Sequence, residues 1–392
     1  MFKALRQQIP YLDYGIFIPY LILSAIGIVM VYSASSYVAA SAGSSPTGYL
    51  IRQCMWVVIG FVFIGVVLAI NLNVFKQLTM WSWMGFIMIG ILIGLRLFGQ
   101  SINGAAGWIV LGPVSVQPAE FCKLYLIVYL SAAIERRERQ HGLVKMVDLN
   151  AQLAMMAVMI ALIVIQPDIG GATINLAIVA VILFASGMSY FIGVGSFAAA
   201  VVAFEWVLIP IVSHLPQHVL GKYYQLRRFL GFMNPFTTAS GAGTQLVNSY
   251  YAISNGGLTG VGIGNSLQKR GFLPEPNTDF IMSITAEELG LIGVILVMLL
   301  LAVIVGRIIY IGVRSANTFN TLVCYGIAAY LTIQAFINVG GIVGLIPITG
   351  VTFPFVSYGG SSMMVLTLSL GLVLNIAARE KRQRAISVRQ ES

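Results

Sequence analysis

The chain has 392 residues, of which 58% are hydrophobic and only 9% charged, and its mean hydropathy is +0.90. Soluble domains carry roughly 25% charged residues, so this composition excludes an ordinary soluble domain and predicts an all-α protein that crosses a membrane repeatedly. The net charge of +9 does not indicate nucleic-acid binding, because the chain has no basic–aromatic stripe and its bases fall mostly at the ends of apolar runs.

Ten apolar runs of about 17–25 residues predict ten transmembrane helices. They lie near 15–37, 52–71, 79–98, 116–134, 150–167, 170–187, 191–213, 280–309, 318–342 and 361–379. The first run lacks a small-residue cleavage site and therefore predicts a retained anchor rather than a signal peptide. The three cysteines, at 54, 122 and 324, lie in or beside apolar runs without metal-ligand spacing, which indicates packing residues rather than disulfides or metal ligands.

The distribution of lysine and arginine predicts the orientation of these helices. With the N-terminus inside, the basic groups at 136–139 and 379–384 are cytoplasmic, and the short outer loops keep only Arg52 and Arg96. We therefore expect one membrane domain over 1–392, with both termini cytoplasmic. A short basic tail covers 380–392, and a long extracellular loop, 214–279, joins the seventh helix to the eighth.

The long loop carries two features that predict function rather than a passive tether. An aromatic–basic cluster suited to a helix at the membrane surface comes first: Tyr223, Tyr224, Arg227, Arg228 and Phe229. A glycine-rich run over 256–264 follows, and we expect it to act as a hinge that gates a groove open to the bilayer.

Asp279 stands where this polar loop gives way to the eighth apolar run. A carboxylate at the mouth of a membrane helix is a candidate functional residue. Asp279, Ser283 and Glu287 are four residues apart, which predicts that they share one helix face. A helix N-terminus lowers the pKa of such a carboxylate and burial raises it, so the direction of the shift stays open.

Further charges lie within or beside the apolar runs. Glu120 and Lys123 are three residues apart on the fourth run, where they either neutralise each other or line a polar cavity. Asp168 follows a proline and either caps the sixth helix or faces the outer site. Two outer segments with unusual backbone, 103–121 and 344–362, join 255–290 in predicting one outward-facing site.

Several stretches together resemble the SEDS family (shape, elongation, division and sporulation proteins). They are NGAAGWIVLGPVSVQPAEFCKL, QPDIGG, the whole of 255–290 and GVTFPFVSYGGSS. The run GIGNSLQKRGFLPE is more similar to the division branch (FtsW-like) than to the elongation branch (RodA-like). The resemblance implies polymerisation of lipid II into glycan strands on the outer face of the bacterial cytoplasmic membrane, at the division septum. It also implies a class B penicillin-binding protein as partner, contacts with other division proteins, and a surrounding of membrane lipid.

The same resemblance implies that Asp279 is the essential acid. Glycosyl transfer needs a base for the acceptor hydroxyl and positive charge near the leaving pyrophosphate. Lys123, Arg227, Arg228, Lys269 and Arg270 are the candidate cations, with a divalent cation as the alternative. Trp108, Glu120, Asp168, Glu287 and Ser357 complete the expected substrate-binding set.

Two other classes of function compete with this one. A lipid II flippase or another transporter should show two repeated halves with broken helices at mid-membrane, and the sequence has no internal repeat. A scaffold that only anchors partners has no use for Asp279.

Overall fold

The computed structural model describes residues 2–41, 43–102, 105–111, 114–142, 146–187, 224–238, 241 and 243–391. The helices in chain order are α1 (Phe2–Gln8), η1 (Ile9–Tyr11), α2 (Tyr14–Ser41), α3 (Thr47–Ala69), α4 (Leu72–Phe75), α5 (Leu78–Phe98), α6 (Pro118–His141), η2 (Met146–Leu149), α7 (Asn150–Ile165), α8 (Ile169–Ala185), α12 (Tyr224–Met233), α13 (Thr244–Gly256), α14 (Ile281–Arg314), α15 (Thr318–Ile342) and α16 (Gly360–Glu391).

Six of the described helices are long and apolar enough to cross a membrane: α2, α3, α5, α14, α15 and α16. Two shorter apolar helices, α7 and α8, match the fifth and sixth predicted runs, and α6 matches the fourth. The seventh predicted run, 191–213, lies outside the described residues, so the count of ten stays a prediction. The coarser prediction of a mostly helical, multi-pass membrane protein is confirmed.

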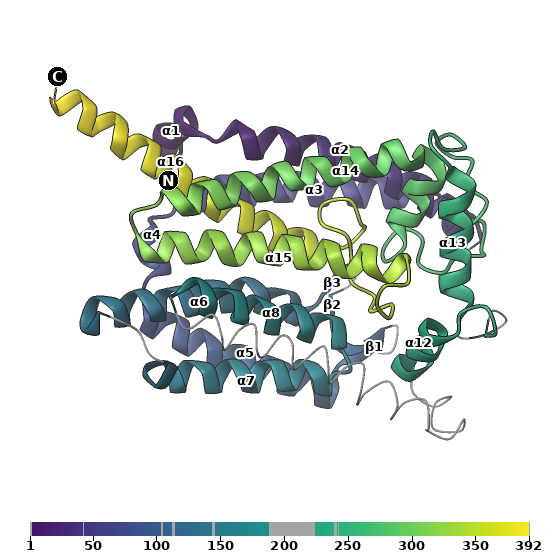
Figure 1. Ribbon diagram of the computed structural model, residues 1–392, viewed down its shortest axis with the longest axis horizontal. Coiled ribbons are helices and arrows are strands. Elements are labelled where there is room, and N and C mark those ends of the chain that lie inside the picture. Colours follow the sequence, from purple (N-terminus) through teal and green to yellow (C-terminus); the bar gives the residue numbers. More distant parts are fainter. Residues whose placement is uncertain are drawn as a thin grey trace.

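The long helices run side by side along the longest axis of the molecule (Figure 1). α3 packs on α16, and α14 lies between α2 and α15. α15 also contacts α6 and α8, so it sits at the centre, and it is with α16 the most buried of the candidate spans. Both chain termini lie at the end where α14 turns into α15, and the sheet, α12 and α13 lie at the opposite end (Figure 1).

The segment 100–116 departs from the all-α prediction. It forms a three-stranded antiparallel sheet in the order β1 (Gln100–Ile102), β2 (Ala105–Leu111) and β3 (Val114–Val116). Its short runs of β-branched and aromatic residues are separated by turn-forming residues, a pattern that favours strands over a helix. The sheet leads directly into α6 and so positions the charged start of that helix.

The beginning of α14 is interrupted, whereas the sequence predicts an unbroken run over 280–309. Gly290 has φ 68° and ψ −172°, values that no helix contains. At this break the glycine-rich run packs against α14, where Leu291 N donates to Gly257 O at 3.0 Å. A Cβ on Gly256 would collide with the carbonyl of Ala286. The glycines therefore allow a close backbone approach here, and the hinge predicted from them stays a prediction.

Candidate functional site

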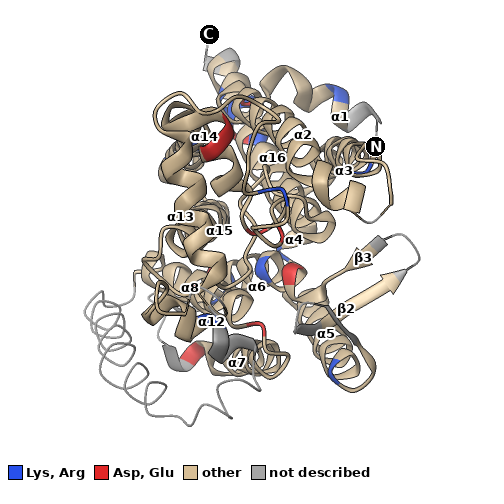
Figure 2. Ribbon diagram, turned by 90° about the vertical axis from the view of Figure 1, so that its right-hand side faces the viewer, with Lys and Arg blue, Asp and Glu red and all other residues tan. Residues whose placement is uncertain are grey.

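Asp279 lies just before α14 at the end of the molecule that carries the sheet. Viewed from that end, the ribbon carries few charged residues (Figure 2). The side chain of Asp279 is 14% exposed, and Arg228 Nη2 on α12 lies 3.6 Å from its Oδ2. Burial raises the pKa of Asp279 to about 6, with the nearby Arg228 opposing that shift and Glu275 reinforcing it. Burial therefore outweighs the proximity of a helix N-terminus, a balance that the sequence leaves open.

The backbone around Asp279 is fixed by the segment 344–359. Asn338 Nδ2 on α15 donates to Asp279 O at 2.8 Å and to Val351 O at 2.7 Å. Ser357 Oγ donates to Thr278 O at 2.7 Å, and Tyr358 N donates to the preceding carbonyl, Asn277 O. The two segments that the sequence assigns to one outer site are thus in contact, and Ser357 acts through the backbone beside Asp279.

Gly350 is a site residue that the sequence analysis does not single out. Its φ is 81°, and an added Cβ would lie 2.9 Å from Arg228 Nη1 and 3.2 Å from Asp279 Oδ2. On the other side of the same segment, a Cβ on Gly170 at the start of α8 would meet the side chains of Thr349 and Val351. The available signal was a glycine that follows Pro347 in a turn-rich segment. Residues 349–351 therefore separate Asp279 from the start of α8.

Asp168 and the start of α6 form a second polar cluster beside that segment. Asp168 Oδ1 accepts from Gly171 N at 2.7 Å, so the helix cap predicted for it is confirmed. Its Oδ2 accepts from Gln117 Nε2 at 3.0 Å. One turn further along α6, Lys123 Nζ lies 2.6 Å from Glu120 Oε1, which confirms the predicted pair.

One face of α15 connects this cluster to Asp279. Tyr330, Gln334 and Asn338 are four residues apart and share that face. Lys123 Nζ lies 5.3 Å from the centroid of the Tyr330 ring, and Gln334 Nε2 donates to Thr352 O at 2.9 Å. We call these three residues the α15 ladder. It runs from the buried lysine to the backbone of Asp279.

Two predicted site residues face other partners. Glu287 accepts from Asn255 Nδ2 at 2.9 Å and from Leu267 N at 3.0 Å. Lys269, which is buried, pairs with Glu288 at 2.7 Å and donates to Ser33 Oγ on α2 at 2.9 Å. These contacts fasten the loop to α14 and α2.

The common helix face predicted for Asp279, Ser283 and Glu287 is not found. Because α14 begins at Ile281, Asp279 has no helical register with the other two. Ser283 Oγ instead lies 2.8 Å from Ser249 Oγ on α13.

The remaining candidates are placed as follows. Arg270 is exposed, and Trp108 is partly buried in β2, opposite Gln100. Tyr223 and the side chain of Arg227 lie outside the described residues.

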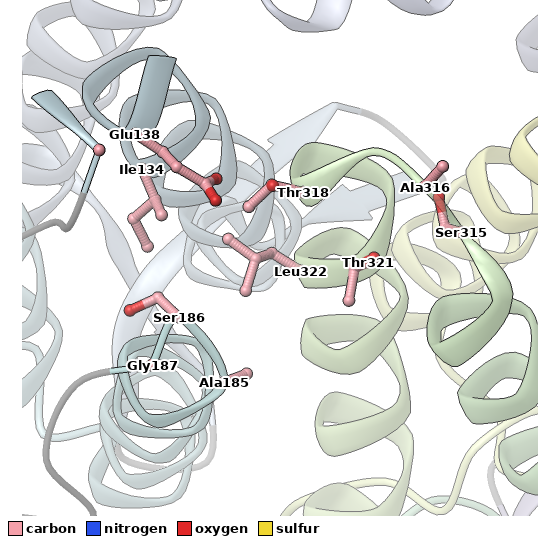
Figure 3. A pocket seen from close by; sticks show the side chains of 11 residues that line it. Ile134, Glu138, Ala185, Ser186, Gly187, Ser315, Ala316, Thr318, Thr321 and Leu322 are labelled. Atoms are coloured by element: carbon pink, nitrogen blue, oxygen red, sulfur yellow. The ribbon is translucent and has the colours of Figure 1, made fainter. Parts of the chain in front are cut away.

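A separate cavity lies away from this site, and the described part of the chain shows no cage of metal ligands. A cavity of about 360 Å³ lies at the other end of the bundle, lined by Ile134, Glu138, Ser186, Ser315, Thr318 and Leu322 among others (Figure 3). Within the described ranges no three His, Cys, Asp or Glu residues gather as metal ligands. The residues around Asp279 therefore do not by themselves form a cage for a divalent cation.

Comparison with known proteins identifies the family of this chain. The family model described as a cell cycle protein (FtsW/RodA/SpoVE) matches residues 14–382. The chain is 38% identical to the "Probable peptidoglycan glycosyltransferase FtsW" of Lactococcus lactis, covering 95% of this chain and 94% of that protein. It is 36% identical to the protein of the same name from Bacillus subtilis, covering 95% and 92%.

Two solved structures share the fold. One is a chain of a peptidoglycan synthase complex that coordinates polymerization and crosslinking, with TM-score 0.72, 26% identity and coverage of 93% of this chain and 97% of that chain. The other is the rod shape determining protein RodA of Thermus thermophilus, with TM-score 0.64, 24% identity and coverage of 93% and 96%. The chain therefore belongs to the FtsW/RodA/SpoVE family, and the SEDS resemblance predicted from its motifs is confirmed.

Proposed function

We propose that this protein is a division-type peptidoglycan glycosyltransferase that polymerises lipid II into glycan strands. The observation that carries the proposal is the buried carboxylate of Asp279, whose pKa is raised to about 6, beside the guanidinium of Arg228. Relatives named peptidoglycan glycosyltransferase FtsW, at 36–38% identity over most of the chain, support the same activity and the division branch. The elongation branch is represented by a more distant structural relative.

Asp279 acts as the general base in this mechanism. Its carboxylate accepts the proton of the acceptor sugar's hydroxyl while that oxygen attacks the anomeric carbon of the donor. The new C–O bond forms as the bond from the anomeric carbon to the pyrophosphate breaks, and the single displacement inverts the configuration. A carboxylate with a pKa near 6 is ionised at neutral pH and is yet a stronger base than an ordinary aspartate, which suits this task.

The leaving pyrophosphate gains one negative charge as its bond to the anomeric carbon breaks, and that charge needs a fixed positive partner. Arg228 is within contact distance of Asp279 and is mostly buried, so its charge is only weakly screened by water there. Lys123 supplies a second buried positive charge at the far end of the α15 ladder, already partnered by Glu120. We assign Arg228 to the pyrophosphate and Lys123 to the remainder of the substrate headgroup.

The setting of the enzyme follows from the same proposal. The likeness to a chain of a peptidoglycan synthase complex supports a class B penicillin-binding protein as partner and lipid II as substrate. We extend this to contacts with other division proteins at the septum. The proposed topology is a single domain over 1–392 with ten spans. Both termini are cytoplasmic, which the shared end of the two termini supports, and the loop 214–279 is extracellular (Figure 1).

Purified protein supplied with labelled lipid II tests the proposal against its competitors. The wild type should form polymer, and Asp279→Asn should polymerise at least about 100-fold more slowly while remaining folded. Glu138→Gln removes an exposed acid beside the cavity at the opposite end and serves as the matched control. Polymer from Asp279→Asn at the wild-type rate would reject the catalytic role. Movement of lipid II across vesicles without polymer would favour the flippase.

A further inference from the structure

Asn338 holds two backbone segments that are far apart in the sequence. Its Nδ2 donates one hydrogen to Asp279 O at 2.8 Å and the other to Val351 O at 2.7 Å. Asn338 is 4% exposed, so water has little access to its amide group. The peptide of Asp279 is therefore anchored to α15 and, through the same amide group, to the segment that carries Gly350.

The orientation of this amide is fixed by its partners. Both short contacts are to carbonyl oxygens, which only accept hydrogen bonds, so the amide nitrogen and not its oxygen must face them. Among the described residues no donor reaches Asn338 Oδ1. Both N–H groups of the side chain therefore donate to the two backbone carbonyls.

Gln334 repeats the arrangement one turn along the α15 ladder. Its Nε2 donates to Thr352 O at 2.9 Å, next to the residue that Asn338 holds. Two successive carbonyls of the 349–352 segment are therefore bound to one helix face. This segment covers Asp279, because Gly350 lies against both the carboxylate and Arg228.

We propose that Asn338 is a positioning residue for glycosyl transfer, acting by fixing the Asp279 peptide against the 349–352 segment. The inference rests on the proposed catalytic role of Asp279. We call the two hydrogen bonds from Asn338 to Asp279 O and Val351 O the clamp. With the clamp in place, the carboxylate keeps its position beside Arg228 and stays shielded from water. Without it, the segment separates from Asp279, water reaches the carboxylate, and the base is misplaced relative to the acceptor hydroxyl.

The chain contains a matched control for this clamp. Asn375 on α16 is fully buried, and its Nδ2 donates to Val67 O at 2.6 Å and to Ile70 O at 2.9 Å. It therefore holds two backbone carbonyls in the same way, but at the end of α3 remote from Asp279. Its Oδ1 also accepts from Arg379 Nε at 2.6 Å, so its removal disturbs at least as many hydrogen bonds.

The experiment compares Asn338→Leu with Asn375→Leu in the full-length protein, with labelled lipid II as substrate. Leucine matches asparagine in shape and removes the donors. Both variants should lower the melting temperature to a similar extent. Only Asn338→Leu should lower kcat, by about 100-fold for a displaced catalytic group, with KM within about threefold of wild type. The acid limb of its rate profile should move to lower pH, because a hydrated carboxylate has a lower pKa.

The comparison of the two leucine variants separates a positioning role from a purely structural one. If kcat and the acid limb of Asn338→Leu match those of Asn375→Leu, Asn338 is only structural and the inference is wrong. If Asn338→Leu cannot be purified, Asn338→Ser, which keeps one donor, replaces it and should show an intermediate loss of kcat. An active Asp279→Asn variant would instead reject the proposed function, so the two failures are distinguishable.

Discussion

Asp13 and Asp279 are two largely buried aspartates at opposite ends of one bundle, and their surroundings differ. Asp13, 1% exposed, accepts from Arg307 at 2.9 Å and from Lys381 at 2.8 Å. Although burial raises the pKa of Asp13, hydrogen bonds from these two cations bring it below the ordinary value. Asp279 has Arg228 at 3.6 Å, and burial prevails, so its pKa is raised to about 6.

The comparison distinguishes a carboxylate used for structure from one available for chemistry. Asp13 joins the start of α2 to α14 and α16, and its charge is balanced by two direct partners. Asp279 is held by its backbone through Asn338, and its carboxylate lies beside one cation, Arg228, and the Thr278 side chain. A buried acid that is anchored through its main chain and keeps a raised pKa is the better candidate for a base.

The largest expected effect is that of Asp279→Asn, which removes the base. Polymerisation should fall by about 10²–10⁴-fold, the usual contribution of a general base. The folded-state pKa is raised, so the stability linked to this group is present at low pH and is lost as pH rises through about 6. At pH 8 the variant should therefore melt at the same temperature as wild type or higher. A marked loss of stability at pH 8 would give Asp279 the structural role of Asp13.

Lys123→Met tests whether the buried pair on α6 is structural, like Asp13, or takes part in the reaction, like Asp279. Removing one partner leaves the other desolvated, at a cost of about 3–5 kcal/mol where burial is complete and toward the lower value here, because Glu120 is 14% exposed. The double variant Glu120→Gln/Lys123→Met should recover most of the loss in thermal unfolding. If the double variant also polymerises lipid II at the wild-type rate, the pair is structural only.

Asp13→Asn should lower stability and leave the chemistry intact. Losing hydrogen bonds to two partly exposed cations should cost about 2 kcal/mol in the free energy of unfolding. Because the folded-state pKa of Asp13 is lowered, its contribution is present above the unfolded pKa and disappears as pH falls through the folded value. Thermal melts from pH 7 down to pH 3 should show wild type and variant converging. A drop in kcat at neutral pH would contradict the assignment.

The pH profile of the wild type gives the mildest test. Only the ionised form of Asp279 accepts a proton, so kcat/KM should have an acid limb with a midpoint near pH 6. Below it the rate should fall about tenfold per pH unit. Asp13→Asn should share this limb, since Asp13 lies at the other end of the bundle (Figure 1). A limb near pH 4 would indicate that the carboxylate is hydrated during turnover.

The sequence alone determined the membrane helices, one buried ion pair and the family of this protein. Apolar runs set which segments become α2, α3, α5, α14, α15 and α16, because length and hydropathy are properties of the chain itself. The three-residue spacing of Glu120 and Lys123 brought that pair together, since helix geometry is local. The motifs around Asp279 likewise indicated the family before any contact was known.

Only the tertiary structure decided the details of the site. Whether Lys269 meets a substrate or Glu288 depends on how the loop folds back on α14. The direction of the pKa shift of Asp279 depends on burial by segments distant in sequence, and the clamp by Asn338 joins residues 59 positions apart. Periodicity carries no record of such contacts, because they arise from packing between elements and not from the spacing of residues within one.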